Sequence, residues 1–296
     1  MAFADSANPL GPSGNLPRRK RVDFAMRSSA TAAAMLAVAV LVIVIASVVA
    51  KGASALSLDF FTKAPPLDGA GGGILPEIVG TGLIVGIATA FALPIGVLIA
   101  IFLSEFAGAR LAYPIRLALD LLNGLPSIVI AVFVYGLLVL GSGQTGMAGS
   151  IALAIIMVPL IARSSQEVLR LVPQTQREAA LALGMSRWRT TLGIVLPAAL
   201  SGIITGAVLA IARAAGETAP LLLTSSFFTP NQPVTGNIFG QAIPNIPIEI
   251  FNQLEAASPY DHARAWGAAL VLVAIILMVS VTARVLLGRS RRKMQR

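Results

Sequence analysis

Long apolar stretches, separated by short basic segments, constrain this sequence more than any other feature. An α-helix rises about 1.5 Å per residue, so about 20 apolar residues cross the roughly 30 Å of hydrocarbon in a bilayer. The fourth stretch is short, which leaves five or seven crossings as alternatives, but we predict an all-α membrane protein with about six transmembrane helices. The stretches run approximately over 29–50, 76–103, 121–140, 147–162, 192–222 and 265–288.

The composition agrees with a lipid environment. The chain of 296 residues is 56% hydrophobic and 12% charged, whereas about a quarter of the residues in a soluble domain carry charge. A cleaved signal peptide is an alternative for the first stretch, because Ala53-Ser54-Ala55 resembles a cleavage site. That stretch is longer than the roughly 7 to 15 residues of a signal-peptide core, so we predict an uncleaved first span.

The distribution of Lys and Arg predicts the orientation. If the N-terminus is cytoplasmic, 18 of the 22 basic residues fall on the cytoplasmic side and only Lys51, Lys63 and Arg264 fall on the other side. This asymmetry follows the positive-inside rule, so both termini should be cytoplasmic. The net charge of +9 is then an orientation signal, and we expect no nucleic-acid partner.

The predicted organisation has one large membrane domain between two basic tails. Residues 1–28 form a cytoplasmic tail, whose first part is rich in Pro, Gly and small polar residues and is expected to be disordered. The transmembrane domain covers 29–288, and residues 289–296 form the second tail. Within the transmembrane domain, the cytoplasmic segment 163–191 and the extracytoplasmic segment 225–262 are long. The extracytoplasmic segment should contain a short amphipathic helix that contacts a soluble partner or only the membrane surface.

Several kinds of chemistry are excluded by the residue types present. The chain has no cysteine and a single histidine, His262, so we predict no catalytic residues and no metal site. None of the four lysines, Lys20, Lys51, Lys63 and Lys293, lies in a Walker A phosphate-binding loop. If ATP drives the process, ATP and Mg²⁺ must be bound by another chain.

The segment before the fifth apolar stretch contains a motif in three separated parts. Helix-forming residues precede Gly184, which is typical of the C-terminal end of a helix, and Pro197 suits the first turn of the next one. We therefore predict a short cytoplasmic helix within 177–190. The motif consists of Glu178-Ala179-Ala180, Gly184, Ile194, Leu196 and Pro197.

This short helix should offer a surface to a partner protein. Ala179 and Ala180 would let another protein approach the helix closely, and charged side chains that can form ion pairs surround them. An amphipathic loop without a partner is the alternative. The charged residues are Arg177, Glu178, Arg187 and Arg189.

Two ionisable residues lie inside the fifth stretch. In a helix counted from Ala198 to Thr224, Arg213 lies near the middle of the membrane, where a charge costs at least about 2.5 to 3.5 kcal/mol. Glu217 follows four residues later on the same face and is its natural partner. Gly216 and Pro220 weaken the helix there, which would free backbone groups to line a cavity.

We predict that these residues belong to a substrate passage. An arginine presents a fork of donors that suits an oxyanion such as phosphate, and Glu217 would neutralise Arg213 when the passage is empty. Thr218 adjoins the pair. An ion pair that only locks two spans together is the alternative.

A second polar group accompanies the third stretch. Asn123 and Ser127 flank a Gly-Pro break near the predicted cytoplasmic start of that span, where the break would line the passage or simply kink the helix. Small residues of the second stretch are instead expected at close-packing positions. These are Gly80, Gly82, Gly86 and Gly96.

The three-part motif resembles the EAA motif of permease subunits in ATP-binding-cassette (ABC) importers. The segment around Arg213, ARAAGETAPLLLT, together with residues 122–136 and 71–107, further resembles the PstA-type permease of phosphate-specific importers. The resemblance implies the type I importer (MetI-like) architecture in the cell membrane, in which the EAA helix docks into a groove of the ATPase. It also implies import of inorganic phosphate by a chain that does not itself hydrolyse ATP.

The same resemblance implies three kinds of partner protein besides membrane lipid: a second, PstC-type permease that forms a heterodimer, two PstB-type ATPase subunits, and an extracytoplasmic PstS-type phosphate-binding protein. Import of sulfate, molybdate or another small solute by the same architecture is the alternative. An ion-gradient-driven carrier usually has internal repeats, and we find none. A membrane-embedded enzyme would need reactive groups that the spans lack.

Overall fold

The computed structural model describes residues 16–66, 71–226 and 237–294, and these residues form helices without a β-strand. The chain divides into two units, residues 1–50 and 51–296, which we describe separately. The first unit contains most of helix α1, Leu16–Gly52. Because α1 begins at Leu16, residues 16–28 of the predicted tail are helical; residues 1–15 lie outside the described part.

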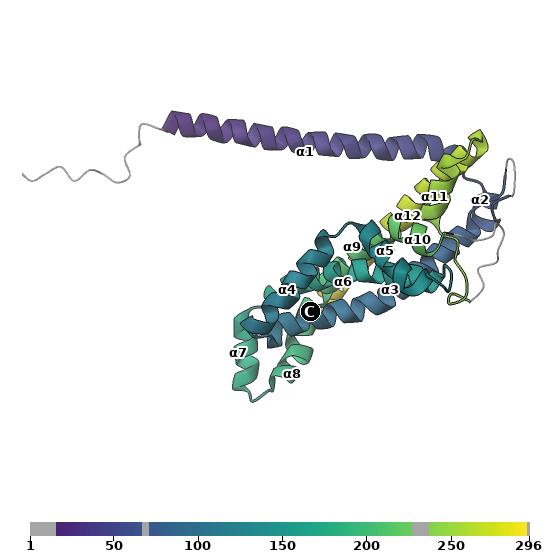
Figure 1. Ribbon diagram of the computed structural model, residues 1–296. Coiled ribbons are helices and arrows are strands. Elements are labelled where there is room, and N and C mark those ends of the chain that lie inside the picture. Colours follow the sequence, from purple (N-terminus) through teal and green to yellow (C-terminus); the bar gives the residue numbers. More distant parts are fainter. Residues whose placement is uncertain (1–15, 67–70, 227–236, 295–296) are drawn as a thin grey trace, which may run out of the picture. The chain divides into compact units, whose positions relative to one another are not determined.

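The second unit contains the remaining helices (Figure 1). Figure 1 places α7 and α8 at one end of this unit and α2 and α11 at the other. Three single turns of π-helix, η2, η3 and η4, continue the ends or beginnings of longer helices. The elements are η1 Ala53–Ala55, α2 Leu58–Thr62, α3 Leu75–Ile101, η2 Phe102–Phe106, α4 Ala109–Gly124, α5 Ser127–Val134, η3 Tyr135–Val139, α6 Gly146–Arg170, α7 Gln174–Ala182, α8 Arg187–Thr190, η4 Thr191–Val195, α9 Leu196–Ala215, α10 Ala219–Thr224, α11 Ile246–Glu255 and α12 Pro259–Met294.

The prediction of an all-α chain with about six spans is confirmed. Among the described residues, five helical stretches are long and apolar enough to cross a membrane, and a sixth is obtained if one bent pair counts as a span. That pair corresponds to the predicted third span, 121–140, which is not a straight helix. Residues 109–124 and 127–139 form two helical arms bent by 100°.

The fourth span is longer than predicted. Helix α6 has 25 residues and ends at Arg170, so Arg163 and Arg170 belong to a helix and not to the predicted loop 163–191. Sequence hydropathy ended the span too early because the polar residues that follow Ala162 continue the helix. Ser165 and Gln166 are buried at 0% and 2% exposure, facing other helices.

The fifth span begins earlier and ends earlier than 192–222. A continuous helical stretch runs from Arg187 to Ala215, and the chain then breaks before α10. Pro197 lies in the first turn of α9, as predicted, although the continuous helical stretch begins before it at Arg187. The π-turn Thr191–Val195 directly precedes α9, and such a turn accommodates the missing N–H and the bulk of the proline ring.

Helices α3, α6 and α9 form the core, and small residues bring them together. Ala88 and Ala92 of α3 have no exposed surface. A Cβ atom at Gly96 would lie 2.8 Å from the Ile161 side chain of α6, so the glycine permits close approach. The prediction of close packing therefore holds for Gly96 and Gly80; at Gly82 and Gly86 a Cβ atom would meet none of the described residues within 4 Å.

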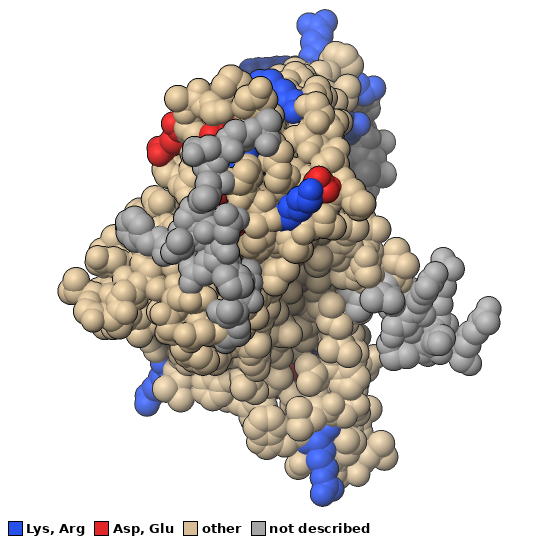
Figure 2. Space-filling model, turned by 90° about the vertical axis from the view of Figure 1, so that its right-hand side faces the viewer, with Lys and Arg blue, Asp and Glu red and all other residues tan. Residues whose placement is uncertain are grey.

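Outside this core, many large apolar side chains are exposed. Figure 2 shows a face of the molecule on which most atoms belong to uncharged residues. An apolar surface of this extent is stable against lipid or another membrane chain, not against water. On α4 and α5 the exposed apolar residues include Leu117, Leu121, Val129, Val132 and Phe133.

The predicted short helix of segment 225–262 is present as α11; residues 227–236 of that segment lie outside the described part. Its first turn is not at the surface, because Ile246 and Ile248 have no exposed surface. Glu249 of α11 is buried together with Glu77 of α3 and Arg264 of α12, at 4%, 2% and 6% exposure. Burial raises the pKa of the Glu249 carboxyl, and the Arg264 charge partly opposes this rise.

A matched pair of substitutions tests the close packing of α3. A methyl group at Gly80 would overlap the backbone carbonyl of Pro244, whereas at Gly82 it would enter open space. We expect Gly80→Ala to lower the free energy of unfolding by about 1 to 3 kcal/mol, as overpacking does. Gly82→Ala should leave it unchanged or slightly raised. Thermal unfolding in detergent measures both, and equal stability of the two variants would contradict this packing.

Candidate functional site

The candidate passage begins at the break between α4 and α5. Gly124 ends α4, and Leu125 and Pro126 adopt extended backbone angles before α5 begins at Ser127. Proline has no N–H to donate and disfavours helical angles in the residue before it, so the Leu-Pro pair ends α4 at this point. The first N–H groups of α5 consequently have no partner within the helix.

A second break separates α9 from α10. The last turn of α9 is tightened by hydrogen bonds from the Gly216 N–H to the Arg213 carbonyl, 3.1 Å, and from the Glu217 N–H to the Ala214 carbonyl, 3.2 Å. Helix α10 then starts at Ala219, with Pro220 in its first turn. The expectation that Gly216 and Pro220 interrupt the helix is confirmed, so Arg213 lies in the last turn of α9 and not in the middle of a continuous helix.

The two breaks meet at one cavity of about 280 Å³. Four of the five residues predicted for the passage line it: Asn123, Ser127, Arg213 and Glu217. Thr218, the fifth, is not among the lining residues. The others come from the end of α4, the α4–α5 break, α5 and α6, and are Leu122, Gly124, Leu125, Pro126, Ile130, Ile156 and Leu160.

Asn123 and Ser127 were expected near the cytoplasmic start of the third span, at a break that would line the passage or kink the helix. The break bends the chain by 100°, and both residues line the same cavity as Arg213. Sequence hydropathy could not indicate this, because both arms of the bend are apolar.

The charged pair in this cavity is loose. Arg213 Nε lies 3.5 Å from Glu217 Oε1, and the side chains are 56% and 19% exposed. Among the described residues, the Arg213 guanidinium donates a hydrogen bond to no acceptor other than Glu217. A guanidinium with most of its donors unused can bind an oxyanion through two parallel N–H···O bonds. The N-terminus of α5, at Ser127, adds free N–H groups and a positive helix dipole at the same cavity.

The predicted short cytoplasmic helix corresponds to α7, followed by a turn and α8. The N–H groups of Gly184 and Met185 donate to the carbonyls of Leu181 and Ala180, at 2.9 and 3.1 Å. This is the Schellman arrangement, which requires a left-handed residue directly after the helix cap. Gly184 has φ +80°, which explains why glycine ends this helix.

The residues predicted for the partner surface are not all accessible. Glu178, Ala179 and Arg187 are exposed, but Ala180 is 2% exposed and packs inside this chain. The prediction that both alanines face a partner is therefore wrong for Ala180. Two apolar residues outside the predicted set are exposed here: Leu183, beside the glycine, is 84% exposed, and Leu181 is 45% exposed.

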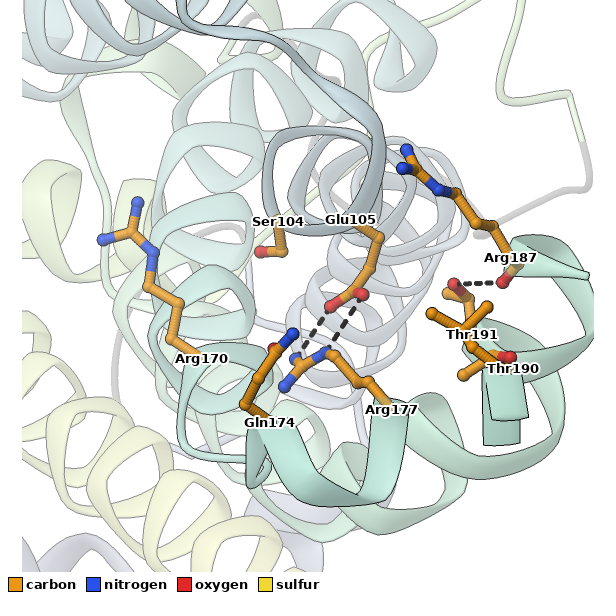
Figure 3. Close-up of a pocket in the computed structure, with 9 residues that line it drawn as sticks. Ser104, Glu105, Arg170, Gln174, Arg177, Arg187, Thr190 and Thr191 are labelled. Carbon is orange, nitrogen blue, oxygen red and sulfur yellow. Dashed lines mark hydrogen bonds and ion pairs between the residues drawn. The ribbon is translucent and has the colours of Figure 1, made fainter. Parts of the chain in front are cut away.

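Arg177 also differs from its predicted role. Its guanidinium is turned inward, where it pairs with Glu105 next to a cavity of about 420 Å³ (Figure 3). The sequence contained no signal for this contact, because the two residues lie 72 positions apart. The periodicity of apolar residues does not show which distant elements pack against each other.

Comparisons with known proteins agree with this fold. Residues 92–296 match the family model "Binding-protein-dependent transport system inner membrane component". The chain is also similar in fold to a chain of the MetNI methionine ABC transporter. The TM-score is 0.57 at 18% identity, and the match covers 73% of this chain and 94% of that one. A chain of a bacterial alginate ABC transporter in complex with a periplasmic protein gives a TM-score of 0.64 at 14% identity, covering 91% of this chain and 96% of that one.

Curated relatives are much more similar in sequence. The phosphate transport system permease protein PstA of Yersinia pestis is 40% identical over 256 residues, 85% of each chain. That of Haemophilus influenzae is 39% identical over 242 residues, 80% of this chain and 84% of the relative. The PstA 1 protein of Mycobacterium tuberculosis is 36% identical over 214 residues, 72% of this chain and 68% of the relative. The chain is therefore an integral membrane permease that belongs to the binding-protein-dependent transport system inner membrane component family, within its PstA group.

Proposed function

We propose that this chain is a membrane-spanning permease subunit of an ATP-driven importer that moves inorganic phosphate into the cell. The observation that carries the proposal is the cavity of about 280 Å³ between two broken spans, with the guanidinium of Arg213 at its wall. Similarity to PstA proteins over most of the chain supports phosphate as the cargo.

The cavity supplies donors of the kind that a tetrahedral oxyanion needs. Arg213 offers a charged fork, and the Ser127 hydroxyl and the Asn123 amide offer neutral donors. When the passage is empty, the carboxylate of Glu217 balances the arginine. An arriving anion competes with this carboxylate for the guanidinium, and the long contact of 3.5 Å makes the competition easy. Because the anion must displace the Glu217 carboxylate, its net binding to Arg213 is weak enough for release.

The energy for transport comes from a separate ATPase. The chain has no Walker A lysine, so ATP and Mg²⁺ are bound by partner subunits and this chain does not hydrolyse ATP. Helix α7 and the turn after it form the docking element, with the exposed residues Glu178, Ala179, Leu183 and Arg187 facing the ATPase. In this assignment α7 and both chain termini are cytoplasmic, as the distribution of Lys and Arg favours.

The remaining partners follow from the incomplete passage. The side chain of Arg213 is 56% exposed, so a second membrane chain is needed to close the route around it. A related PstC-type permease would supply the other half of the passage by forming a heterodimer with this chain. Two PstB-type ATPase subunits would bind at the α7 end. A PstS-type phosphate-binding protein would deliver the anion at the opposite, extracytoplasmic end. The exposed apolar surface contacts lipid, and no nucleic acid takes part.

The donors around Arg213 fit other tetrahedral oxyanions as well as phosphate, because sulfate and molybdate present the same oxygen geometry. Selection among these anions would then rest mainly with the binding protein. Competition for the uptake of labelled phosphate by excess sulfate or molybdate distinguishes the three cargoes.

Substitution of Arg213 tests the passage. We expect Arg213→Gln to reduce phosphate uptake roughly tenfold to a hundredfold, because hydrogen bonds to a charged group contribute about 1.5 to 3 kcal/mol. Arg213→Lys, which keeps the charge and loses the fork, should be intermediate. Co-purification of the ATPase should be unchanged in both variants. Uptake at the wild-type rate by Arg213→Gln would remove this residue from the mechanism.

Two substitutions test docking at α7. Glu178→Lys reverses a charge on the exposed face of the helix, and Gly184→Val forces a branched residue into a left-handed conformation at a cost of about 1 to 2 kcal/mol. Both should lower phosphate uptake at least about fivefold and weaken co-purification of the ATPase while membrane insertion is retained. Gly184→Asn is the matched control, because asparagine tolerates this conformation. Unchanged uptake in Glu178→Lys and Gly184→Val would contradict the docking assignment.

A further inference from the structure

A largely buried ion pair joins α7 to the end of a helix that is distant in sequence. The Arg177 Nε and Nη2 atoms donate to the two carboxylate oxygens of Glu105, at 3.2 and 2.9 Å. Their side chains are only 15% and 10% exposed. Figure 3 shows the two groups face to face beside the cavity, with Arg170 and Arg187 at its margins. The pair has the forked geometry that fixes both distance and direction.

Arg177 also holds the end of α6. Its Nη1 and Nη2 atoms donate to the carbonyls of Val172, at 2.5 Å, and Leu169, at 2.9 Å. Carbonyl groups at the C-terminal end of a helix have no partner within the helix, and a positive charge there is favourable. One side chain therefore connects α7, the end of α6 and the π-turn η2 that follows α3.

The position of Glu105 links this contact to the candidate passage. Glu105 lies in η2, and α4 begins three residues after η2 ends, at Ala109. Helix α4 has 16 residues, which is a length of about 24 Å, and it ends at Gly124 in the wall of the Arg213 cavity. A displacement of η2 thus reaches the break between α4 and α5 along a single helix. Near the far end of α4, Asp120 forms an ion pair with Arg163 of α6.

We propose that the Arg177–Glu105 pair transmits movement of α7 through η2 and α4 to the cavity at Arg213. The inference rests on the proposed docking of the ATPase at α7 and assigns the step that follows docking. Both residues are positioning residues, because they contact neither nucleotide nor transported anion. Since Arg177 is turned inward, its replacement leaves the exposed docking face of α7 intact.

A pair that only stabilises the fold would behave differently from one that transmits movement. Removing one partner of a largely buried ion pair destabilises a protein, because the remaining charge is left desolvated and unpaired. A structural pair would therefore affect the amount of assembled protein, whereas a transmitting pair affects the number of anions moved per ATP hydrolysed. This ratio is the readout that separates the two roles.

The experiment uses the complete transporter, with the second permease, the ATPase and the phosphate-binding protein, reconstituted in proteoliposomes. Uptake of radiolabelled phosphate and hydrolysis of ATP are measured for Arg177→Gln, Glu105→Gln and the double variant. We expect the complex to assemble and ATP hydrolysis to persist, while phosphate moved per ATP falls about tenfold in each single variant. The double variant should fall no further, because the two residues act as one unit.

Two additional variants make the outcome decisive. Arg170→Gln removes an exposed arginine from the same cavity and should keep the wild-type ratio. Arg177→Lys keeps the buried charge but loses the fork; its ratio should be reduced, and it replaces the neutral variants if these fail to assemble.

Three results would overturn the inference: a wild-type ratio in Arg177→Gln or in Arg177→Lys, a double variant whose loss is the product of the two single losses, or selective loss of the ATPase from the Arg177→Gln complex. The last result would assign Arg177 to docking. Absence of the ATPase from the purified wild-type complex would instead contradict the proposed function, so the two failures are distinguishable.

Discussion

The structure depends on a constraint that lipid imposes on the backbone. Every N–H and C=O group in the hydrocarbon region must be satisfied, so a helix can be interrupted there only where it lines a cavity or packs inside protein. This chain interrupts two of its apolar spans, at Leu125–Pro126 and at Gly216–Thr218. Both interruptions lie at the cavity that contains Arg213. The same constraint thus brings the two breaks in these spans to one place, where polar side chains accompany them.

The two ends of the second unit have separate tasks. At one end, α11 is anchored by buried side chains against α3 and α12, beyond the cavity. At the other end, α7 presents exposed residues on one face and fixes Arg177 against η2 and α6 on the other. The cavity lies between these ends, and α4 connects it to the α7 end. The proposed function requires such a connection, because it assigns ATP hydrolysis to a separate subunit that docks at α7.

Much of this organisation could be predicted from the sequence, because hydropathy and glycine or proline positions report local constraints. The spans, the end of α7 at Gly184 and the weak point at Gly216 follow from them. The 100° bend did not, since Gly124 and Pro126 reveal that a helix is interrupted but not where its two arms point. Burial of Ala180 and the pairing of Arg177 with Glu105 depend on tertiary packing of distant segments, which a single sequence does not encode in any local pattern.

The central claim is that an anion passes the cavity between the two broken spans, and that the ATPase opens this cavity alternately to the two sides of the membrane. The chain has no native cysteine, so Ser127→Cys places one unique thiol in the cavity wall. In the assembled transporter, a membrane-impermeant maleimide should label this thiol from the ATPase side without nucleotide and from the opposite side when ATP is trapped. Excess phosphate should slow the labelling. Labelling that is absent from both sides, or that does not change with nucleotide, would contradict the account.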